Sequence, residues 1–159
     1  ELVTGIDLPS SPVGALRQQM QRGLSALPAE RPIIVFGCDH GAAVAPLAGP
    51  YVAALSLACT GQLPPSFIEY ALRDGAAGVL VSGCKAGGCE FRLGARWTEE
   101  RMLGLREPHL RGQVPRERLE VAWADAGEEA RLRRALERLR ERVRGLRAAP
   151  GPDPIISHA

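Results

Sequence analysis

The sequence has little net charge and almost no lysine. Its 159 residues include 20 basic and 18 acidic side chains, which gives a net charge of +2 with histidine neutral, and Lys85 is the single lysine. A domain that binds RNA or DNA usually combines a much larger positive excess with a recognisable module. The charge balance therefore argues against a nucleic-acid-binding protein.

The sequence also lacks a long apolar run. A membrane-spanning helix needs about 18 or more consecutive apolar residues, and no stretch approaches that length. We therefore expect no membrane insertion by this segment. No signal peptide is visible and the chain starts with Glu1, which we interpret as a segment of a larger polypeptide. These features predict a cytoplasmic location, or the membrane face of a larger membrane-bound protein.

Cysteine is scarce, and the motifs that most often define its use are missing. Four cysteines are too few for a fold held together by disulfides, and their number favours a reducing compartment. No C-x2-C pair occurs, although such pairs are usual in structural zinc sites and in dithiol redox enzymes. No G-x-x-x-x-G-K-[ST] phosphate loop occurs either. We therefore expect the cysteines to form a metal or redox site of a less common pattern.

Short apolar runs alternate with helical patterns along the chain. The runs that predict strands are 33–37, 51–59, 76–84 and 119–124. The segments that predict helices between them are 42–48, 65–74 and 96–105. Strands that alternate with helices are typical of an α/β fold. We predict a small parallel sheet in a flavodoxin-like or Rossmann-like three-layer arrangement, with extra N- and C-terminal helices.

Amphipathic helices are expected on both sides of this unit. One runs from Val13 to Leu27. The other begins near Asp125, which has capping-box spacing with Glu128. The apolar seam of the second helix is Leu132, Leu136, Leu139, Val143 and Leu146. We expect this seam to pack on its own domain, with an oligomer contact through the terminal helices as the alternative. The predicted division is a linker plus amphipathic helix (1–31), an α/β domain (32–124), a C-terminal amphipathic helix (125–148) and a disordered tail (149–159).

The cysteines all follow predicted strands. Cys38 follows the first strand, Cys59 ends the second, Cys84 ends the third and Cys89 lies in the loop beyond it. The carboxyl ends of parallel strands share one edge of a sheet, where ligands usually bind in this architecture. We therefore expect all four thiols to converge there.

Four thiolates with no oxygen ligand suit either zinc or an iron–sulfur cluster. The C-x4-C spacing of Cys84 and Cys89 wraps readily around a cluster, which is larger than a single ion. Gly83, Gly87 and Gly88 would permit positive φ angles and let backbone N–H groups approach the sulfurs. A structural zinc-binding interaction module and a dithiol redox enzyme that uses Cys84 and Cys89 remain the alternatives.

Several segments resemble the delta-subunit family of methyl-viologen-reducing hydrogenase. They are "AAGVLV" followed by "GCKAGGCEFRLG", the upstream "LACTGQLPPSFIEYALRDGA", and the later "VPRERLEVAWADAGE". The resemblance covers residues 32–130 and implies a [2Fe–2S] electron-transfer domain of an oxidoreductase, with no substrate chemistry of its own. It implies Cys38, Cys59, Cys84 and Cys89 as cluster ligands. Redox proteins or adjacent ferredoxin or flavin domains would be the partners.

The sequence departs from the family pattern at two places. The family commonly has a C-x-x-C pair after its first strand, where this chain reads "CDHG" with Gly41 in the second position. The family loop often reads G-D-C-H-Y, and here it reads "GGCEF". His40 is a second-shell candidate together with Gly87 and Gly88, and it is the alternative ligand if a thiolate is replaced.

Basic residues follow or flank the cysteine loop. Lys85, Arg92, Arg96 and Arg101 would form a collar for an acidic electron-transfer partner. The alternative is a solvated helix face, because charged side chains mostly lie in water.

Overall fold

The computed structural model describes residues 8–146. In this range the chain alternates between strands and helices. The elements are α1 (Val13–Ser25), β1 (Ile33–Cys38), η1 (Ala45–Leu47), β2 (Val52–Leu57), η2 (Thr60–Gln62), α2 (Ser66–Arg73), β3 (Gly78–Gly83), α3 (Gly94–Met102), η3 (Arg116–Arg118), β4 (Leu119–Trp123) and α4 (Glu129–Arg144). The predicted tail at 149–159 lies outside the described residues. The predicted division of the chain into four segments stays a prediction.

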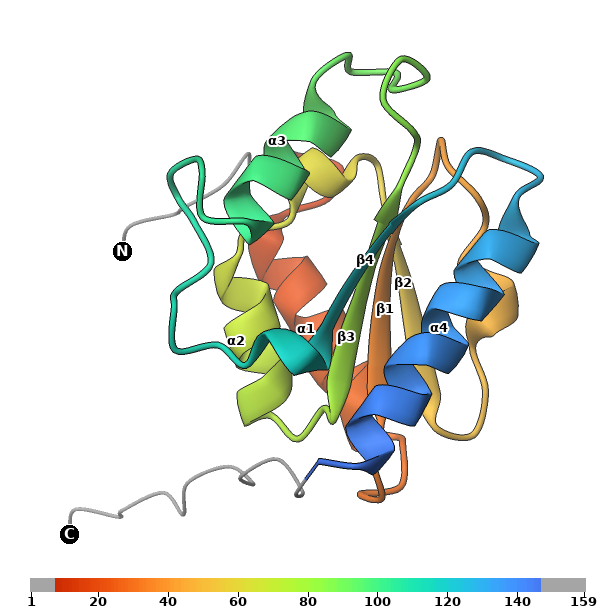
Figure 1. The fold of residues 1–159 in the computed structure, drawn as a ribbon. Coiled ribbons are helices and arrows are strands. Elements are labelled where there is room, and N and C mark those ends of the chain that lie inside the picture. The colour runs from red at the N-terminus through yellow and green to blue at the C-terminus, as the bar shows by residue number, and fades with distance from the viewer. Residues whose placement is uncertain (1–7, 147–159) are drawn as a thin grey trace, which may run out of the picture.

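The strands form one parallel sheet in the order β2-β1-β3-β4. β1 and β3 lie in the middle and every residue in them is buried, which explains why their sequences are continuous apolar runs. Helices cover both faces of the sheet (Figure 1). The predicted three-layer α/β fold is therefore confirmed.

The two faces of the sheet have separate cores. On one face, Ile34 and Phe36 of β1 pack with residues of α1 and α2. On the other face, Ile33 and Val35 pack with α4. Side chains alternate between the faces along a strand, so neighbouring residues of β1 serve opposite layers.

The apolar seam of α4 packs on the sheet of its own chain, as expected. Leu132, Leu136, Leu139 and Val143 are buried there, and Leu146 is partly buried beside them. The seam is therefore occupied by the sheet. An oligomer through other faces of the terminal helices stays a prediction.

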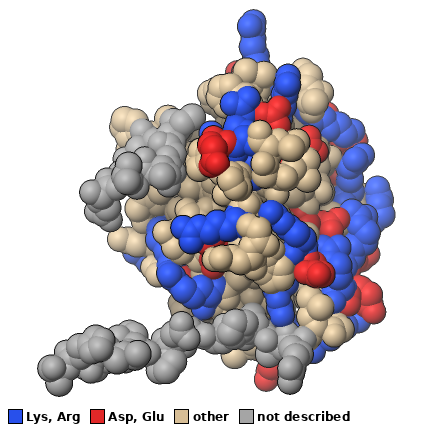
Figure 2. All heavy atoms as spheres, turned by 60° about the vertical axis from the view of Figure 1, so that its left-hand side comes forward, with Lys and Arg blue, Asp and Glu red and all other residues tan. Residues whose placement is uncertain are grey.

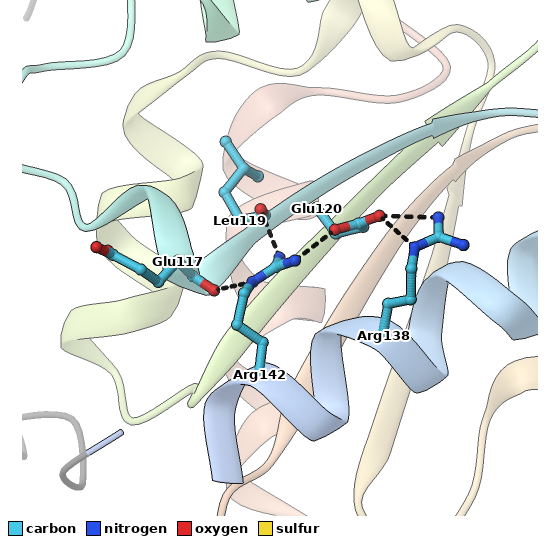
Figure 3. Close-up of polar contacts among 5 residues, drawn as sticks. All are labelled: Glu117, Leu119, Glu120, Arg138 and Arg142. Carbon is cyan, nitrogen blue, oxygen red and sulfur yellow. Dashed lines mark hydrogen bonds and ion pairs between the residues drawn. The ribbon is translucent and has the colours of Figure 1, made fainter. Parts of the chain in front are cut away.

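Ion pairs attach α4 to the edge strand β4 (Figure 3). The Glu120 carboxylate accepts hydrogen bonds from Arg138 and Arg142, with a shortest distance of 2.9 Å for each pair. Arg142 also donates to the backbone carbonyls of Glu117 and Leu119, at 2.7 and 3.0 Å. These contacts join the helix to the strand at the end of the sheet that is remote from the cysteines.

Two helix predictions differ from the structure in detail. The segment at 42–48 contains only the short 3₁₀ helix η1, which has a proline in its first turn. The segment at 96–105 is α3, which starts earlier at Gly94 and ends at Met102. Gly104 follows with φ of +81°, and such a left-handed residue is a common helix stop. The segment at 65–74 is α2, as predicted.

No helix within residues 8–146 combines the length and the apolar character that crossing a membrane requires.

Candidate functional site

The four cysteines lie at the carboxyl edge of the sheet. Cys38 is the last residue of β1, Cys59 comes shortly after β2, and Cys84 directly follows β3. Cys89 lies in the loop between β3 and α3. β1 and β2 end level with each other, because Cys38 is in register with Leu57. The structure thus brings together the residues that the sequence separates by up to 51 positions, from Cys38 to Cys89.

The thiols contact one another through a chain of hydrogen bonds. Cys38 shares one with Cys59 and one with Cys84, and Cys84 shares another with Cys89. Cys38, Cys84 and Cys89 form a buried cluster of their own, separate from the two apolar cores. Cys59 is half-buried. All four are free thiols, so the fold contains no disulfide among them.

Backbone N–H groups converge on the sulfur atoms. The N–H of His40 donates to Cys38 Sγ at 3.4 Å, and the N–H of Gly61 donates to Cys59 Sγ at 3.3 Å. Cys89 accepts from the backbone of Ala95, near the start of α3. Such hydrogen bonds stabilise negative charge on sulfur.

The hydrogen bond between Cys38 and Cys59 shifts their two pKa values in opposite directions. The hydrogen bond from the Cys59 thiol lowers the pKa of Cys38 to about 5, and the N–H of His40 adds to this effect, while burial opposes it. The same hydrogen bond raises the pKa of Cys59, and burial raises it further. The lowered pKa of Cys38 favours its thiolate form in the metal-free protein.

The pKa values of Cys84 and Cys89 are also shifted in opposite directions. Burial raises the pKa of Cys84 to about 12, and the hydrogen bond to Cys89 acts in the same direction. Burial also acts to raise the pKa of Cys89, but hydrogen bonds from Ala95, Phe91 and Cys84 outweigh it, and the pKa is lowered. A metal that binds these sulfurs would displace the protons that the thiols still carry.

Gly94 lets the loop after β2 approach the start of α3 closely. A Cβ atom at Gly94 would lie 2.3 Å from Cys59 Sγ and 3.4 Å from Cys89 Sγ. Gly61 is close as well, since a Cβ there would lie 3.1 Å from the Gly94 Cα. Only glycine at position 94 leaves room for the Cys59 sulfur.

Residues that follow β4 hold the cysteine loop. The N–H of Lys85 donates to Asp125 Oδ1 at 2.9 Å, and the Lys85 ammonium pairs with Glu128. Only one of the two hydrogen bonds of the predicted capping box between Asp125 and Glu128 forms. Glu128 accepts from the N–H of Asp125 at 2.9 Å, but the Asp125 carboxylate binds Lys85 instead of the helix start. The helix itself begins at Glu129.

The glycines of the loop follow the prediction in part: Gly87 has the expected positive φ, while the N–H of Gly88 binds a carbonyl. Gly87 has φ of +91° and needs its freedom for the turn. Gly88 donates its N–H to the carbonyl of Lys85, and a Cβ there would lie 3.2 Å from Asp125 Oδ1. Gly83 faces Thr60 and Trp123 closely. The loop glycines therefore complete the turn and its contact with Asp125, while His40 and Gly61 donate their N–H groups to sulfur.

The His40 side chain lies at the surface of the site. Its imidazole ring meets the Phe91 ring edge to face, with 5.8 Å between the ring centroids. Phe91 is 56% exposed. His40 therefore contributes its backbone N–H to Cys38 and places its ring over the cysteine loop.

Most side chains of the predicted basic collar form ion pairs or hydrogen bonds with other residues of the same chain. Lys85 pairs with Glu128, Arg96 pairs with Glu100, and Arg101 donates to a backbone carbonyl. On the face that carries α3, Lys and Arg side chains alternate with Asp and Glu (Figure 2). Arg92 is the one member whose side chain has no intramolecular partner among residues 8–146. This distribution favours the solvated-face alternative for most of the collar.

The donor set of the site fits an iron–sulfur group. It consists of thiol sulfurs that already receive N–H hydrogen bonds, which suits a cluster held by cysteine alone. No set of three or more His, Cys, Asp or Glu side chains within the described part of the chain is arranged to hold a single metal ion.

Comparison with known sequences points to redox complexes. The family described as "Methyl-viologen-reducing hydrogenase, delta subunit" matches residues 33–147. The iron-sulfur subunit of the F420-non-reducing hydrogenase vhc from Methanococcus voltae is 26% identical over 97 residues, which are 61% of this chain and 67% of that protein. The iron-sulfur subunit of the F420-non-reducing hydrogenase vhu from Methanococcus maripaludis is 30% identical over 135 residues, which are 80% of this chain and 98% of that protein.

A larger protein contains a similar segment. One subunit of the ferredoxin:CoB-CoM heterodisulfide reductase from Methanosarcina mazei is 34% identical over 74 residues, which are 46% of this chain and 9% of that protein. The matched sequence therefore occurs both as most of a small protein and as a minor part of a long chain.

Sequence reasoning missed the roles that four residues have in the site. Asp125 follows β4 at the same edge as the cysteines, and its position after a strand could have identified it. Gly94 opens a helix, which by itself is no signal of a close approach to sulfur. Gly61 gave no signal, and Arg101 was predicted only as a collar residue, because the hydrogen bond between them joins residues that are 40 positions apart.

Proposed function

We propose a function from the premise that the chain belongs to the methyl-viologen-reducing hydrogenase delta-subunit family. The chain is a module of a redox complex of the hydrogenase or heterodisulfide-reductase type. Its role is to relay single electrons through one [2Fe–2S] cluster. The ligands are Cys38, Cys59, Cys84 and Cys89.

The meeting of four thiols at one sheet edge carries this proposal. Four cysteines from three separate strand ends contact one another, although nothing in an apolar core requires them to meet. The names of the relatives as iron-sulfur subunits support the same cofactor class. Four cysteine thiols are the number that an all-cysteine [2Fe–2S] cluster needs, and hydrogen bonds already connect all four.

The protein sets the environment of that chemistry. A cluster held by cysteine alone accepts and returns one electron without binding a substrate. The N–H groups of His40 and Gly61 stabilise negative charge on Cys38 and Cys59, which favours the reduced form. Burial of Cys38 and Cys84 keeps water away from their sulfurs.

A partner can approach from the side of the cysteine loop. Phe91 and Leu93 are 56% and 40% exposed, and both belong to the segment that follows Cys89. A thin layer of exposed side chains between the thiols and solvent suits electron transfer to a docked protein. We propose redox proteins, or adjacent ferredoxin or flavin domains, as the partners.

Analysis of metal, sulfide and paramagnetism tests the proposal. Protein purified without oxygen should be brown and should contain about two irons and two acid-labile sulfides per chain. After reduction with dithionite it should give a paramagnetic signal in electron paramagnetic resonance. A colourless protein with one zinc per chain would replace the cluster by the structural zinc alternative.

Single serine variants test the ligand set. Serine in place of each of the four cysteines should remove the wild-type signal or shift it strongly. If Cys59→Ser leaves the spectrum unchanged, Cys59 is not a ligand. If only Cys84→Ser and Cys89→Ser have an effect and the protein forms a reversible disulfide, the dithiol alternative holds.

A further inference from the structure

We propose that Arg101 positions the cysteine site and that its positive charge raises the reduction potential there. This inference rests on the proposed function, because it concerns the cluster that the four thiols would hold. Arg101 belongs to the last turn of α3, and its backbone lies outside the cysteine loop. It touches none of the thiols directly and acts through Gly61.

Two hydrogen bonds connect the Arg101 guanidinium to the Cys59 sulfur. Arg101 Nη1 donates to the carbonyl oxygen of Gly61 at 3.1 Å. The N–H of the same glycine donates to Cys59 Sγ at 3.3 Å. One side chain therefore holds Gly61, the residue whose N–H contacts the sulfur, within the short helix η2 that begins at Thr60.

Arg101 also joins the two halves of the site. Gly94 and Ala95 at the first turn of α3 donate toward Cys89, and Arg101 at the last turn reaches the loop of Cys59. The backbone of Gly61 lies against Gly94, with 3.1 Å from an added Gly61 Cβ to the Gly94 Cα. The helix α3 thus connects the loop of Cys59 with Cys89.

The charge of Arg101 is poorly compensated. Burial lowers the pKa of its guanidinium, and the neighbouring charge of Arg106 lowers it further. Its Nε atom is buried without a hydrogen-bond partner, and no ion pair to Arg101 occurs among residues 8–146. By contrast, Arg96 and Arg106 both pair with Glu100. Arg101 is therefore a partly buried cation beside a site rich in thiolates.

A cation in this position favours the reduced state. Reduction adds one negative charge to a group that thiolates already make negative. Water screens a partly buried charge less than an exposed one, so the guanidinium attracts that added charge. Replacing Arg101 with a neutral side chain should therefore make the group harder to reduce.

Redox titration of three variants tests this inference in the full-length protein purified without oxygen. Arg101→Gln removes both the charge and the end of the side chain that reaches the Gly61 carbonyl, whereas Arg101→Lys keeps the charge and a donor on a long side chain. Arg96→Gln is the matched control, since it removes the same charge from an exposed position of the same helix, where the side chain is 69% exposed. The fraction of reduced cluster is followed by electron paramagnetic resonance.

At the potential that half-reduces the wild type, the ratio of reduced to oxidised cluster should fall about three- to tenfold in Arg101→Gln. Arg101→Lys and Arg96→Gln should each stay within about twofold of the wild type. Loss of the cluster from Arg101→Gln with retention in Arg101→Lys would support the positioning role. A change in Arg101→Gln no larger than in Arg96→Gln, or an equal change in Arg101→Lys, would overturn the inference. Wild-type protein without iron would instead remove the proposed function.

Discussion

Gly94 and Cys59 are packed so closely that no side chain fits between them. A Cβ atom at Gly94 would lie 2.3 Å from Cys59 Sγ, although the two residues come from different loops. The contact places the loop after β2 against the first turn of α3, whose N–H groups face Cys89. The shape of the site thus depends on the absence of one methyl group.

Gly94→Ala should therefore damage the site. The added methyl must push the Cys59 sulfur away, and overpacking of this kind typically costs about 1–3 kcal/mol. We expect the variant to retain less than about half of the wild-type iron, measured by metal analysis after anaerobic purification. Gly14→Ala is the control, because it also lies near a helix start but has no atom within 4 Å of an added Cβ. Equal iron content in both variants would show that the loop relaxes around the methyl group.

The thiolate of Cys38 should make the metal-free protein sensitive to acid. Its pKa is about 5 in the folded state, against an ordinary value of 9.0. Between these values the unfolded chain binds more protons than the folded chain, so stability rises with pH. This contribution is fully present above pH 9.0 and is lost as the pH falls through about 5. The free energy of unfolding should fall by about 1 kcal/mol per pH unit in this window.

Denaturant unfolding of metal-free protein at several pH values between 5 and 8 measures this slope. The Cys38→Ser variant should have a much smaller slope, since serine does not titrate in this range. A slope that persists in Cys38→Ser would assign the acid sensitivity to another group.

Asp125 should control how firmly the cysteine loop is held. Asp125→Ala leaves the Lys85 N–H without its acceptor, and such a loss costs about 1–3 kcal/mol for a buried group. We expect faster loss of iron to a chelator, followed by visible absorption. Asp125→Asn keeps an oxygen acceptor and should behave much more like the wild type. If Asp125→Ala loses iron no faster than Asp125→Asn, the hydrogen bond to Lys85 does not secure the loop.

The Glu120 ion pairs should affect stability without affecting the site. Glu120 is 13% exposed and accepts from two arginines of α4, so Glu120→Ala should reduce the free energy of unfolding by about 1–2 kcal/mol. Iron content and the redox titration should stay as in the wild type, because the pairs lie at the other end of the sheet. Glu141→Ala breaks a pair whose members are 76% and 69% exposed, and it should change stability by less than about 0.5 kcal/mol. Chemical denaturation of both variants checks the difference.

The sequence by itself determined the sheet and the region of the site. β1 and β3 are buried on both faces, so their continuous apolar runs mark them as parallel strands without any knowledge of their partners. Parallel strands end at one edge, and the cysteines follow three of the strand ends. The parallel topology that the sequence predicts therefore places Cys38, Cys59 and Cys84 near one another.

Only the tertiary structure decided the contacts within the site. Asp125 has the spacing of a helix cap, yet its carboxylate binds the N–H of Lys85, because the folded chain brings a loop from 40 positions away to that carboxylate. The contact between Arg101 and Gly61 is equally invisible in the order of residues. Local patterns predict elements because their forces act between neighbours. The groups that tune the thiols act across loops, and the packing of α3 on the sheet edge brings them together.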